Sequence, residues 1–328
     1  MRNLAGYFLM NEKTLYKKPA LTILDQIKLY QSRGLLIPNP AFSASKLSAI
    51  SYYRLSGYAR YFTQAGDCLH GFIPGTTFEQ IFTLYSFDKE LRLLILDAIE
   101  SIEVAVRTAI NNVMSTKYDP HWFLKKECFK ESAIFTHKKL KIMIEKATGK
   151  RRDGEKDKLT QDIIFKSYYQ KYHSPELPPC WMIAEAISLG TWSLMYQHLR
   201  NKSDRQEISI NFKIPPKVLD SWLHCLTILR NLCAHHAIVW RRTYPVTPKI
   251  LYKKHQKVAT PKREDQDWHG LIYEQLAVLS YLLKSIDMDA DWEGKLLVLL
   301  QKYQLIPIQE MGFPKNWHKE PFQGVIKE

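Results

Sequence analysis

Apolar residues recur along most of this chain at three- and four-residue steps, which is the spacing of one face of an α-helix. The clearest case runs from Thr77 to about Thr116, where neither Gly nor Pro interrupts the pattern. Thr77 and Gln80, or alternatively Thr76 and Glu79, have the spacing of a capping box, in which two side chains pair with the free amides at a helix start. This stretch predicts one long helix, or two helices that are nearly collinear.

Shorter helical patterns account for most of the remaining chain. Before the long helix, one helix is expected from Thr22 to about Arg33 and a second from Ser45 to about Leu55, with Gly57 as its terminator. The segment between Tyr244 and Pro261 contains several prolines and is expected to form a loop or short strands. The pattern is typical of an all-α fold. Further helices are expected over 133–147, 160–172, 180–199, 203–211, 216–235, 271–286 and 292–303.

These elements predict a helical bundle with an N-terminal helical extension and inserted loops. Residues 1–75 are expected to form the N-terminal helical region. Residues 76–290 are expected to form the main helical domain, which includes a basic insert. Residues 291–328 are expected to add a C-terminal helix and a docked tail.

Positive charge dominates the composition. The 328 residues include 47 Lys and Arg against 33 Asp and Glu, which gives a net charge of +14 at pH 7. A surplus of this size favours polyanionic partners such as nucleic acid. The five cysteines show no C-x-x-C spacing, so we expect reduced thiols rather than a disulfide framework. No apolar run is long enough to cross a membrane, and we expect a cytoplasmic protein with no membrane partner.

The most informative stretch is Arg230 to His236, which reads RNLCAHH. It lies within the 43 residues from Ser221 to Arg263, which contain nine Lys or Arg and no Asp or Glu. An imidazole can take or give a proton near neutral pH, and a guanidinium can bind a phosphate through two parallel hydrogen bonds. Arg230 and His235, with Asn231 beside them, therefore predict cleavage of an RNA phosphodiester.

The predicted helix that carries this motif has two contrasting faces. His224, Asn231 and His235 share the face opposite the apolar stripe, because successive helical residues turn by about 100°. Arg230 and His235 are about 140° apart on an ideal helix. Either the helix distorts near Cys233, or the long Arg side chain reaches around it, or two copies of the chain meet and each gives one Arg and one His. We favour the third arrangement. The apolar stripe consists of Leu219, Trp222, Leu223, Leu226, Leu229 and Cys233.

The chemistry that these groups predict is transesterification without a metal or any other cofactor. A base removes the proton of the ribose 2′-hydroxyl, whose oxygen attacks the adjacent phosphorus, and an acid protonates the leaving 5′-oxygen. Arg230 would neutralise charge on the phosphate oxygens, while Asn231 would orient an imidazole or a phosphate. The expected products carry a 2′,3′-cyclic phosphate and a 5′-hydroxyl, and DNA would not be cut because it lacks the 2′-hydroxyl.

Several further residues are candidates for supporting roles. His236 and His224 are additional imidazoles, and Glu103, which is expected to pair with Arg107, is a candidate to orient the motif. For Glu103 the alternative interpretation is a structural ion pair. For the cations between residues 241 and 257, the alternative is a solvated basic loop that does not contact RNA. The residues expected to contact RNA are Arg54, Arg241, Arg242, Lys249, Lys253, Lys254 and Lys257.

Two other clusters allow more than one interpretation. Zinc could bind between the His and Cys residues at 224, 225, 233 and 235, but their spacing matches no ordinary finger or ribbon, so we expect no metal. A second cluster mixes rings and cations, either as an RNA-stacking surface or as a helix end that packs into the core. It consists of Tyr52, Tyr53, Arg54, Tyr58, Arg60 and Tyr61.

Four separate motifs occur in an order shared with a known family. They are YRLSGY from Tyr53 to Tyr58, the run from Phe87 to Arg107, the RNLCAHH stretch, and MGFP from Met311 followed by Trp317. Together they resemble the Abi-like family, the AbiD and AbiF phage abortive-infection proteins of bacteria. The resemblance extends over about residues 20 to 320.

The resemblance implies a HEPN-like helical bundle, related to domains of type VI CRISPR effector nucleases, whose R-x4-6-H motif is an endoribonuclease site. Arg230, Asn231 and His235 match the common RN-x3-H form. His236 is an extra imidazole, so the sequence leaves open which His transfers the proton. One good copy of the motif implies a homodimer. The resemblance further implies a growth-arresting toxin in phage defence, and some members of the family are toxins paired with a small structured antitoxin RNA.

Two other classes of function fit parts of the pattern. About half of one R-x4-H match is expected by chance in this composition, so a catalytically silent RNA-binding protein stays open. In that case Arg230 and His235 only hold phosphate. Residues 22–60 could also form a helix-turn-helix DNA regulator, although the two short helices lack a persuasive base-reading face.

Overall fold

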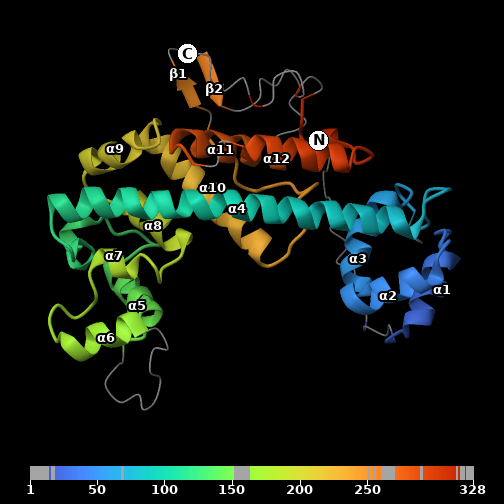
Figure 1. Cartoon of the computed structure of the whole chain (residues 1–328), viewed down its shortest axis with the longest axis horizontal. Coiled ribbons are helices and arrows are strands. Elements are labelled where there is room, and N and C mark those ends of the chain that lie inside the picture. Colours follow the sequence, from blue (N-terminus) through green and yellow to red (C-terminus); the bar gives the residue numbers. More distant parts are fainter. Residues whose placement is uncertain are drawn as a thin grey trace, which may run out of the picture. The chain divides into compact units, whose positions relative to one another are not determined.

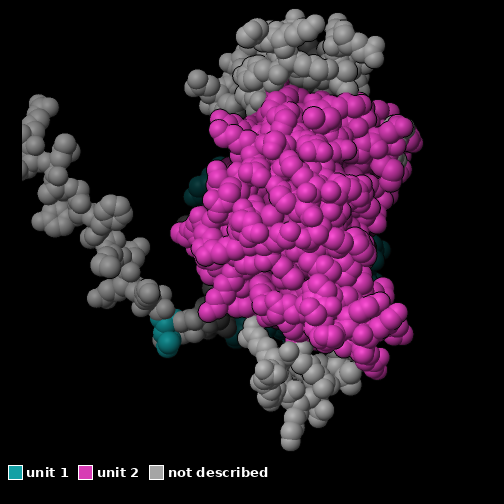
Figure 2. All heavy atoms as spheres, turned by 90° about the vertical axis from the view of Figure 1, so that its left-hand side faces the viewer, with its two compact units in different colours: residues 1–85 teal, residues 86–328 magenta. Residues whose placement is uncertain are grey.

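The structure, a computed structural model, describes residues 15, 19–67, 70–150, 163–249, 251–253, 256–259, 270–288, 291–314, 317 and 322. The chain divides into two compact units, unit 1 with residues 1–85 and unit 2 with residues 86–328, which Figure 2 colours separately. This division falls inside the long predicted helix, whereas the sequence predicts boundaries after residues 75 and 290.

Helices make up almost all of the regular structure, so the predicted all-α class is confirmed (Figure 1). The single sheet among the described residues is an antiparallel hairpin of β1 (Leu251–Lys253) and β2 (Gln256–Ala259). No helix in the described part of the chain is both long and apolar enough to cross a bilayer. The helices are α1 (Ile23–Ser32), α2 (Pro40–Ile50), α3 (Tyr52–Ala59), α4 (Phe78–Lys117), α5 (His137–Ala147), α6 (Ile163–Lys171), α7 (Cys180–Ile183), α8 (Leu189–His198), α9 (Lys202–Ile210), α10 (Pro216–Ala234), α11 (Ile272–Ser285) and α12 (Trp292–Lys302).

In unit 1 the predicted bounds of the second helix are wrong. α2 begins earlier, at Pro40, because the Asn39 side chain accepts from Phe42 N at 2.9 Å and proline suits the first helical position. The chain then breaks at Ser51 and starts α3 directly. Gly57 consequently lies inside a helix and does not end one.

The long predicted helix forms as one element, α4, without a break. Its start has the predicted capping box, since Thr77 N donates to Gln80 Oε1 at 2.9 Å and Gln80 N donates to Thr77 Oγ1 at 3.3 Å. In unit 2, α12 lies along α4 (Figure 1), and the Trp292 indole N–H donates to the Leu94 carbonyl at 3.0 Å. α4 thus provides the element against which unit 2 is assembled.

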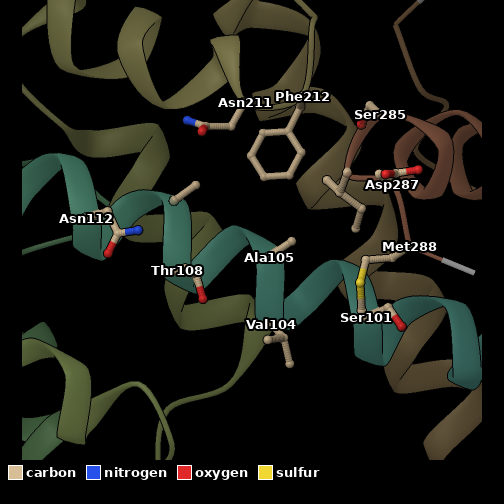
Figure 3. A pocket seen from close by; sticks show the side chains of 12 residues that line it. Ser101, Val104, Ala105, Thr108, Asn112, Asn211, Phe212, Ser285, Asp287 and Met288 are labelled. Carbon is tan, nitrogen blue, oxygen red and sulfur yellow. The ribbon is translucent and has the colours of Figure 1, made fainter.

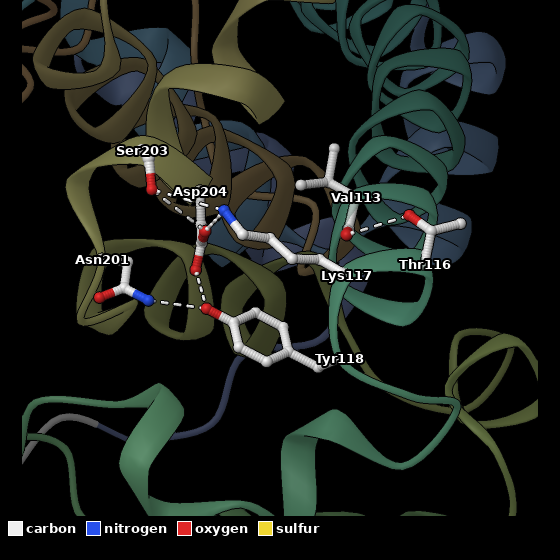
Figure 4. A network of polar contacts seen from close by, with 7 residues as sticks. All are labelled: Val113, Thr116, Lys117, Tyr118, Asn201, Ser203 and Asp204. Carbon is white, nitrogen blue, oxygen red and sulfur yellow. Dashed lines mark hydrogen bonds and ion pairs between the residues drawn. The ribbon is translucent and has the colours of Figure 1, made fainter.

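A buried carboxylate on α9 fixes the C-terminal end of α4. Asp204 is 1% exposed, and it accepts from Lys117 Nζ at 2.5 Å and from Tyr118 Oη at 2.8 Å (Figure 4). Asn201 Nδ2 donates to the same tyrosine oxygen at 2.7 Å. An unpaired charge is costly to bury, so this network sets the position of α9 against α4.

The helix predicted over 180–199 is in fact two helices, α7 and α8, with a corner between them. The Ser188 side chain caps the start of α8. Arg107 of α4 holds the corner, because Nη1 donates to the Ala184 carbonyl at 2.9 Å and Nη2 lies 3.4 Å from Glu185 Oε2. Arg107 therefore pairs with Glu185 rather than with Glu103 as predicted.

α8 packs antiparallel to α10. Near the end of α8, Tyr196 Oη donates to the carbonyl of Pro216, at the start of α10, at 3.4 Å. Gly190, at the start of α8, lies so close to α10 that a Cβ there would be 3.1 Å from Thr227 Cγ2. The corner before α8 is therefore directed toward the C-terminal end of α10.

A second buried carboxylate, Asp88 of α4, holds the chain that follows α10. It is 0% exposed, and its Oδ1 accepts from the backbone amides of Val239 at 3.1 Å and Trp240 at 2.9 Å. Its Oδ2 is bonded to Arg92, one turn further along α4 and 5% exposed. Arg92 Nη1 also donates to the Ala237 carbonyl at 3.3 Å. One buried ion pair thus fixes the backbone directly after α10.

Asp88→Ala is expected to lower the free energy of unfolding by about 3–5 kcal/mol. The substitution leaves the Arg92 guanidinium buried without its carboxylate and two backbone amides without an acceptor. Urea unfolding followed by circular dichroism measures the loss. The matched control is Glu90→Ala on the same helix, whose 2.8 Å pair with Lys302 Nζ is at the surface and contributes about 1 kcal/mol or less. Equal losses in the two variants would contradict a special role for Asp88.

Candidate functional site

α10 has the two faces that the sequence predicts. Every residue of the predicted apolar stripe is buried, and none is more than 1% exposed. Among them, the Trp222 indole N–H donates to the Lys249 carbonyl at 2.9 Å. His224, Asn231 and His235 are all exposed. Two imidazoles and an amide are therefore accessible on the face opposite the core.

α10 ends in a Schellman motif, in which backbone amides beyond the helix satisfy its last carbonyls. His236 N donates to the Cys233 carbonyl at 3.0 Å, and Ala237 N donates to the Leu232 carbonyl at 2.8 Å. His235 is the C-cap residue with φ −88°, whereas His236 is left-handed with φ 58°. Glycine usually occupies this left-handed position because it has no Cβ. His236 is thus held against its backbone preference, immediately after His235.

Arg230 lies four residues before the last residue of α10, Ala234, and is partly buried. Its Nη1 donates to Asn231 Oδ1 at 3.4 Å, and among the described residues no hydrogen bond joins it to His235. The helix continues as far as Ala234, so a distortion near Cys233 does not bring the pair together. The two arrangements that stay open are a longer reach by the Arg side chain and a site shared by two copies of the chain.

Cys225 and Cys233 belong to the core. Burial raises the pKa of each thiol to about 12, so both are protonated at neutral pH. They lie on the buried stripe, whereas His224 and His235 are exposed on the other face. The four side chains therefore do not converge as zinc ligands do. In the part of the chain that the structure describes, no group of three or more His, Cys, Asp or Glu could hold a metal ion.

The predicted auxiliary residues are at different distances from the motif. His224 precedes His235 by about three turns, or roughly 16 Å along the helix axis. Glu103 makes no hydrogen bond or ion pair to Arg230 or His235 among the described residues. His236 is therefore the auxiliary group that the chain keeps next to the motif.

Four of the cations predicted to contact RNA are at least partly accessible, namely Arg54, Arg241, Arg242 and Lys249. Arg241 and Arg242 follow the segment held by Asp88 and are exposed, although Arg241 Nε pairs with Glu310 Oε2 at 2.7 Å. Arg54 lies on α3 in unit 1. Arg241 and Arg242 are thus the predicted cations that follow the motif most directly along the chain.

The predicted lysines lie elsewhere. Lys249 is beside the start of α10, where its backbone amide donates to Ser221 Oγ at 3.0 Å. This position is about 20 Å along the helix axis from the C-terminal end of α10. The backbones of Lys253 and Lys257 belong to the hairpin, while their side chains and all of Lys254 lie outside the described residues.

Sequence reasoning missed the roles of Asp88 and Arg92. Both residues lie within the apolar pattern of α4, between Leu84 and Ile95. Charged residues at such positions are rarely buried unless they are paired, and the i,i+4 spacing allows the pair. A charge inside an apolar stripe is the signal that could have found them.

Unit 2 also has an open groove, which is separate from the motif. It lies between α4, the residues after α9 and the corner after α11 (Figure 3). Small and apolar side chains such as Val104, Ala105 and Phe212 line it, together with one carboxylate, Asp287. The lining contains neither Arg nor His, so the groove lacks the groups that phosphate cleavage needs.

The sequence profile described as Abi-like protein matches residues 45–241. This range includes Asp88, Arg92 and the whole motif from Arg230 to His236. No curated protein and no solved structure matches the chain. Because the matched range covers more than half of the 328 residues, the chain belongs to the Abi-like protein family.

Proposed function

We propose that this protein is an abortive-infection toxin that cleaves RNA as a HEPN-type endoribonuclease. The observation that carries the proposal is the position of Arg230, Asn231 and His235 at one end of α10, with the amide and the imidazole exposed. Membership of the Abi-like family supports a role in phage defence. The net charge of +14 supports an RNA substrate, since polyanions bind basic proteins by counterion release.

The reaction proposed for the motif is transesterification. One imidazole removes the proton of the ribose 2′-hydroxyl, and that oxygen attacks the adjacent phosphorus. The 5′-oxygen leaves with a proton donated by a second group, which acts as the acid. Arg230 stabilises the charge that develops on the phosphate oxygens, and Asn231, which accepts from Arg230 at 3.4 Å, orients the guanidinium.

The fold supports this chemistry by holding the motif in one geometry. The Schellman motif fixes the backbone at His235 and His236, and the Asp88–Arg92 pair fixes the segment that follows. Catalytic groups that are held in place before the substrate binds require little rearrangement in the transition state. A buried ion pair next to an exposed motif therefore favours a catalytic role for the motif over an ordinary helix end.

We propose that two copies of the chain form the complete site. The reaction needs a base and an acid as well as a cation, whereas one protomer does not join its own Arg230 to His235. In a symmetric dimer the same surface of each copy faces the other. The C-terminal end of α10 in each copy would then give one His and one Arg, so that two of each surround one phosphate. The toxin would act in the cytoplasm and could be held inactive by a small structured antitoxin RNA.

Arg230→Ala and His235→Ala are each expected to lower kcat for RNA cleavage by roughly 100-fold or more, because each removes a group that acts in the transition state. Gel analysis of the products, with assignment of the 2′,3′-cyclic phosphate and 5′-hydroxyl ends, measures the effect. His224→Ala is the matched control, since it removes an exposed imidazole of the same helix and should leave kcat unchanged. Full cleavage by both motif variants would show that the motif is not the catalytic site. If the parent protein binds RNA but never cuts it, a catalytically silent RNA-binding protein is favoured.

His236→Gly is expected to raise the free energy of unfolding by about 1 kcal/mol, because glycine adopts the left-handed conformation without a Cβ penalty. Cleavage should persist within a few-fold of the parent if His235 transfers the proton. Thermal or urea unfolding and the cleavage assay are run on the same preparation. If the variant is more stable but inactive, His236 rather than His235 transfers the proton.

Mixed dimers test the shared site. Parent and His235→Ala chains carrying different tags are coexpressed in equal amounts, so that they assort at random. If both imidazoles are needed at one phosphate, the total activity should fall to about a quarter of the parental value, since only parent dimers are active. Activity that falls only to about half would mean that each protomer works alone.

A further inference from the structure

The turn between α2 and α3 in unit 1 has an unusual backbone. Ser51 alone joins the two helices with φ 76° and ψ 147°, a combination that residues with side chains rarely adopt. Its amide donates to the Leu47 carbonyl at 3.1 Å, and its carbonyl accepts from Leu55 N at 3.2 Å. Its hydroxyl accepts from Arg54 N at 3.4 Å. Bonds to both helices thus keep Ser51 in a strained conformation.

The neighbouring tyrosines have different surroundings. Tyr52 packs against Tyr30 of α1 with ring centroids 4.7 Å apart, and its hydroxyl accepts from Arg33 Nη1 at 3.0 Å. Tyr58 is fully buried. Tyr53, in contrast, is 88% exposed. The aromatic cluster of this segment is therefore partly core, as one interpretation of the sequence has it, but one ring is left in solvent.

Positive groups accompany the exposed ring. Tyr53, Gly57 and Arg60 are spaced at i, i+4 and i+7, which places them on one helix face, and Gly57 adds no side chain between the ring and the guanidinium. Arg54 is adjacent to Tyr53 along the chain. From residue 26 to residue 66 the sequence contains five Lys or Arg and no Asp or Glu. We call these four residues, Tyr53, Arg54, Gly57 and Arg60, the Tyr53 surface.

We propose that the Tyr53 surface binds unpaired RNA, with one base stacked on the Tyr53 ring and the neighbouring guanidiniums near its phosphates. Base–aromatic stacking accepts any base because every base has a π face. The surplus of cations attracts the phosphate backbone. The proposal takes RNA as the ligand from the proposed function, but it requires no cleavage. It gives unit 1 a binding role of its own, apart from the motif on α10.

The test measures the Kd of an unstructured, fluorescent RNA of roughly 12 nucleotides for the full-length protein carrying His235→Ala, which prevents cleavage. Tyr53→Ala in this background is expected to raise the Kd about tenfold, the loss that one stacked base represents. Tyr53→Phe keeps the ring and should bind like its parent. Tyr172→Ala is the matched control, since it removes a tyrosine that is 47% exposed with Lys171 Nζ 5.3 Å from its ring centroid, and it should leave the Kd unchanged.

The double variant Arg54→Gln, Arg60→Gln is expected to weaken binding and to reduce the dependence of the Kd on salt. An unchanged Kd in Tyr53→Ala, or equal losses in the Ala and Phe variants, would overturn the stacking proposal. Absence of measurable binding by the parent would overturn it too. If the parent binds duplex DNA more tightly than the RNA, and the same variants lose that binding, the Tyr53 surface recognises DNA and the RNA proposal is wrong. The readout is binding alone, so this proposal and the ribonuclease proposal can fail independently.

Discussion

The buried carboxylate of Asp88 is the constraint on which the candidate site depends. It joins two parts of the chain that are far apart in sequence, namely α4 and the segment that directly follows α10. Its two oxygens have separate tasks, since one accepts from Val239 and Trp240 and the other binds Arg92. A carboxylate that is 0% exposed is tolerated only with such partners. The energy of burying this charge is therefore coupled to the position of the motif.

The polar groups of this protein that bear on chemistry lie at helix ends. His235 caps α10 and His236 leaves it in a left-handed conformation, while Ser51 joins α2 to α3 with a positive φ. Both left-handed residues carry side chains at positions where glycine would be less strained. Such conformations persist where surrounding contacts determine them, and they are common at functional sites. In each unit the strained residue lies close to the proposed site in sequence, since His236 directly follows His235 and Ser51 precedes Tyr53 by two residues.

α4 sets the geometry of unit 2 from both of its ends. Near the start of that unit, Asp88 holds the chain after α10, and at the C-terminal end of α4 Lys117 and Tyr118 bind the buried Asp204 of α9. Between them, Arg107 fixes the corner before α8. Because α8 is antiparallel to α10, these contacts also restrict the helix that carries the motif. A single long helix can thus fix the positions of several distant elements, because it makes a few polar contacts with each of them.

The sequence by itself determined what depends on residues a few positions apart. It specified the all-α class, the helical pattern of α4, the buried stripe of α10 and the exposed position of His235, because helical periodicity records which face meets water. It left open whether α4 is one helix or two and which residues form its capping box, which the structure shows to be Thr77 and Gln80 at the start of one unbroken helix. The breaks at Ser51 and before α8, the partner of Arg107 and the partners of Asp88 were decided only by the tertiary structure. At the corner before α8, the contact from Arg107 comes from a residue 77 positions earlier in the chain, and tertiary contacts of this kind override local helical preference. The backbone amides that donate to Asp88 lie about 150 residues further along the chain, a distance at which no local pattern specifies a partner.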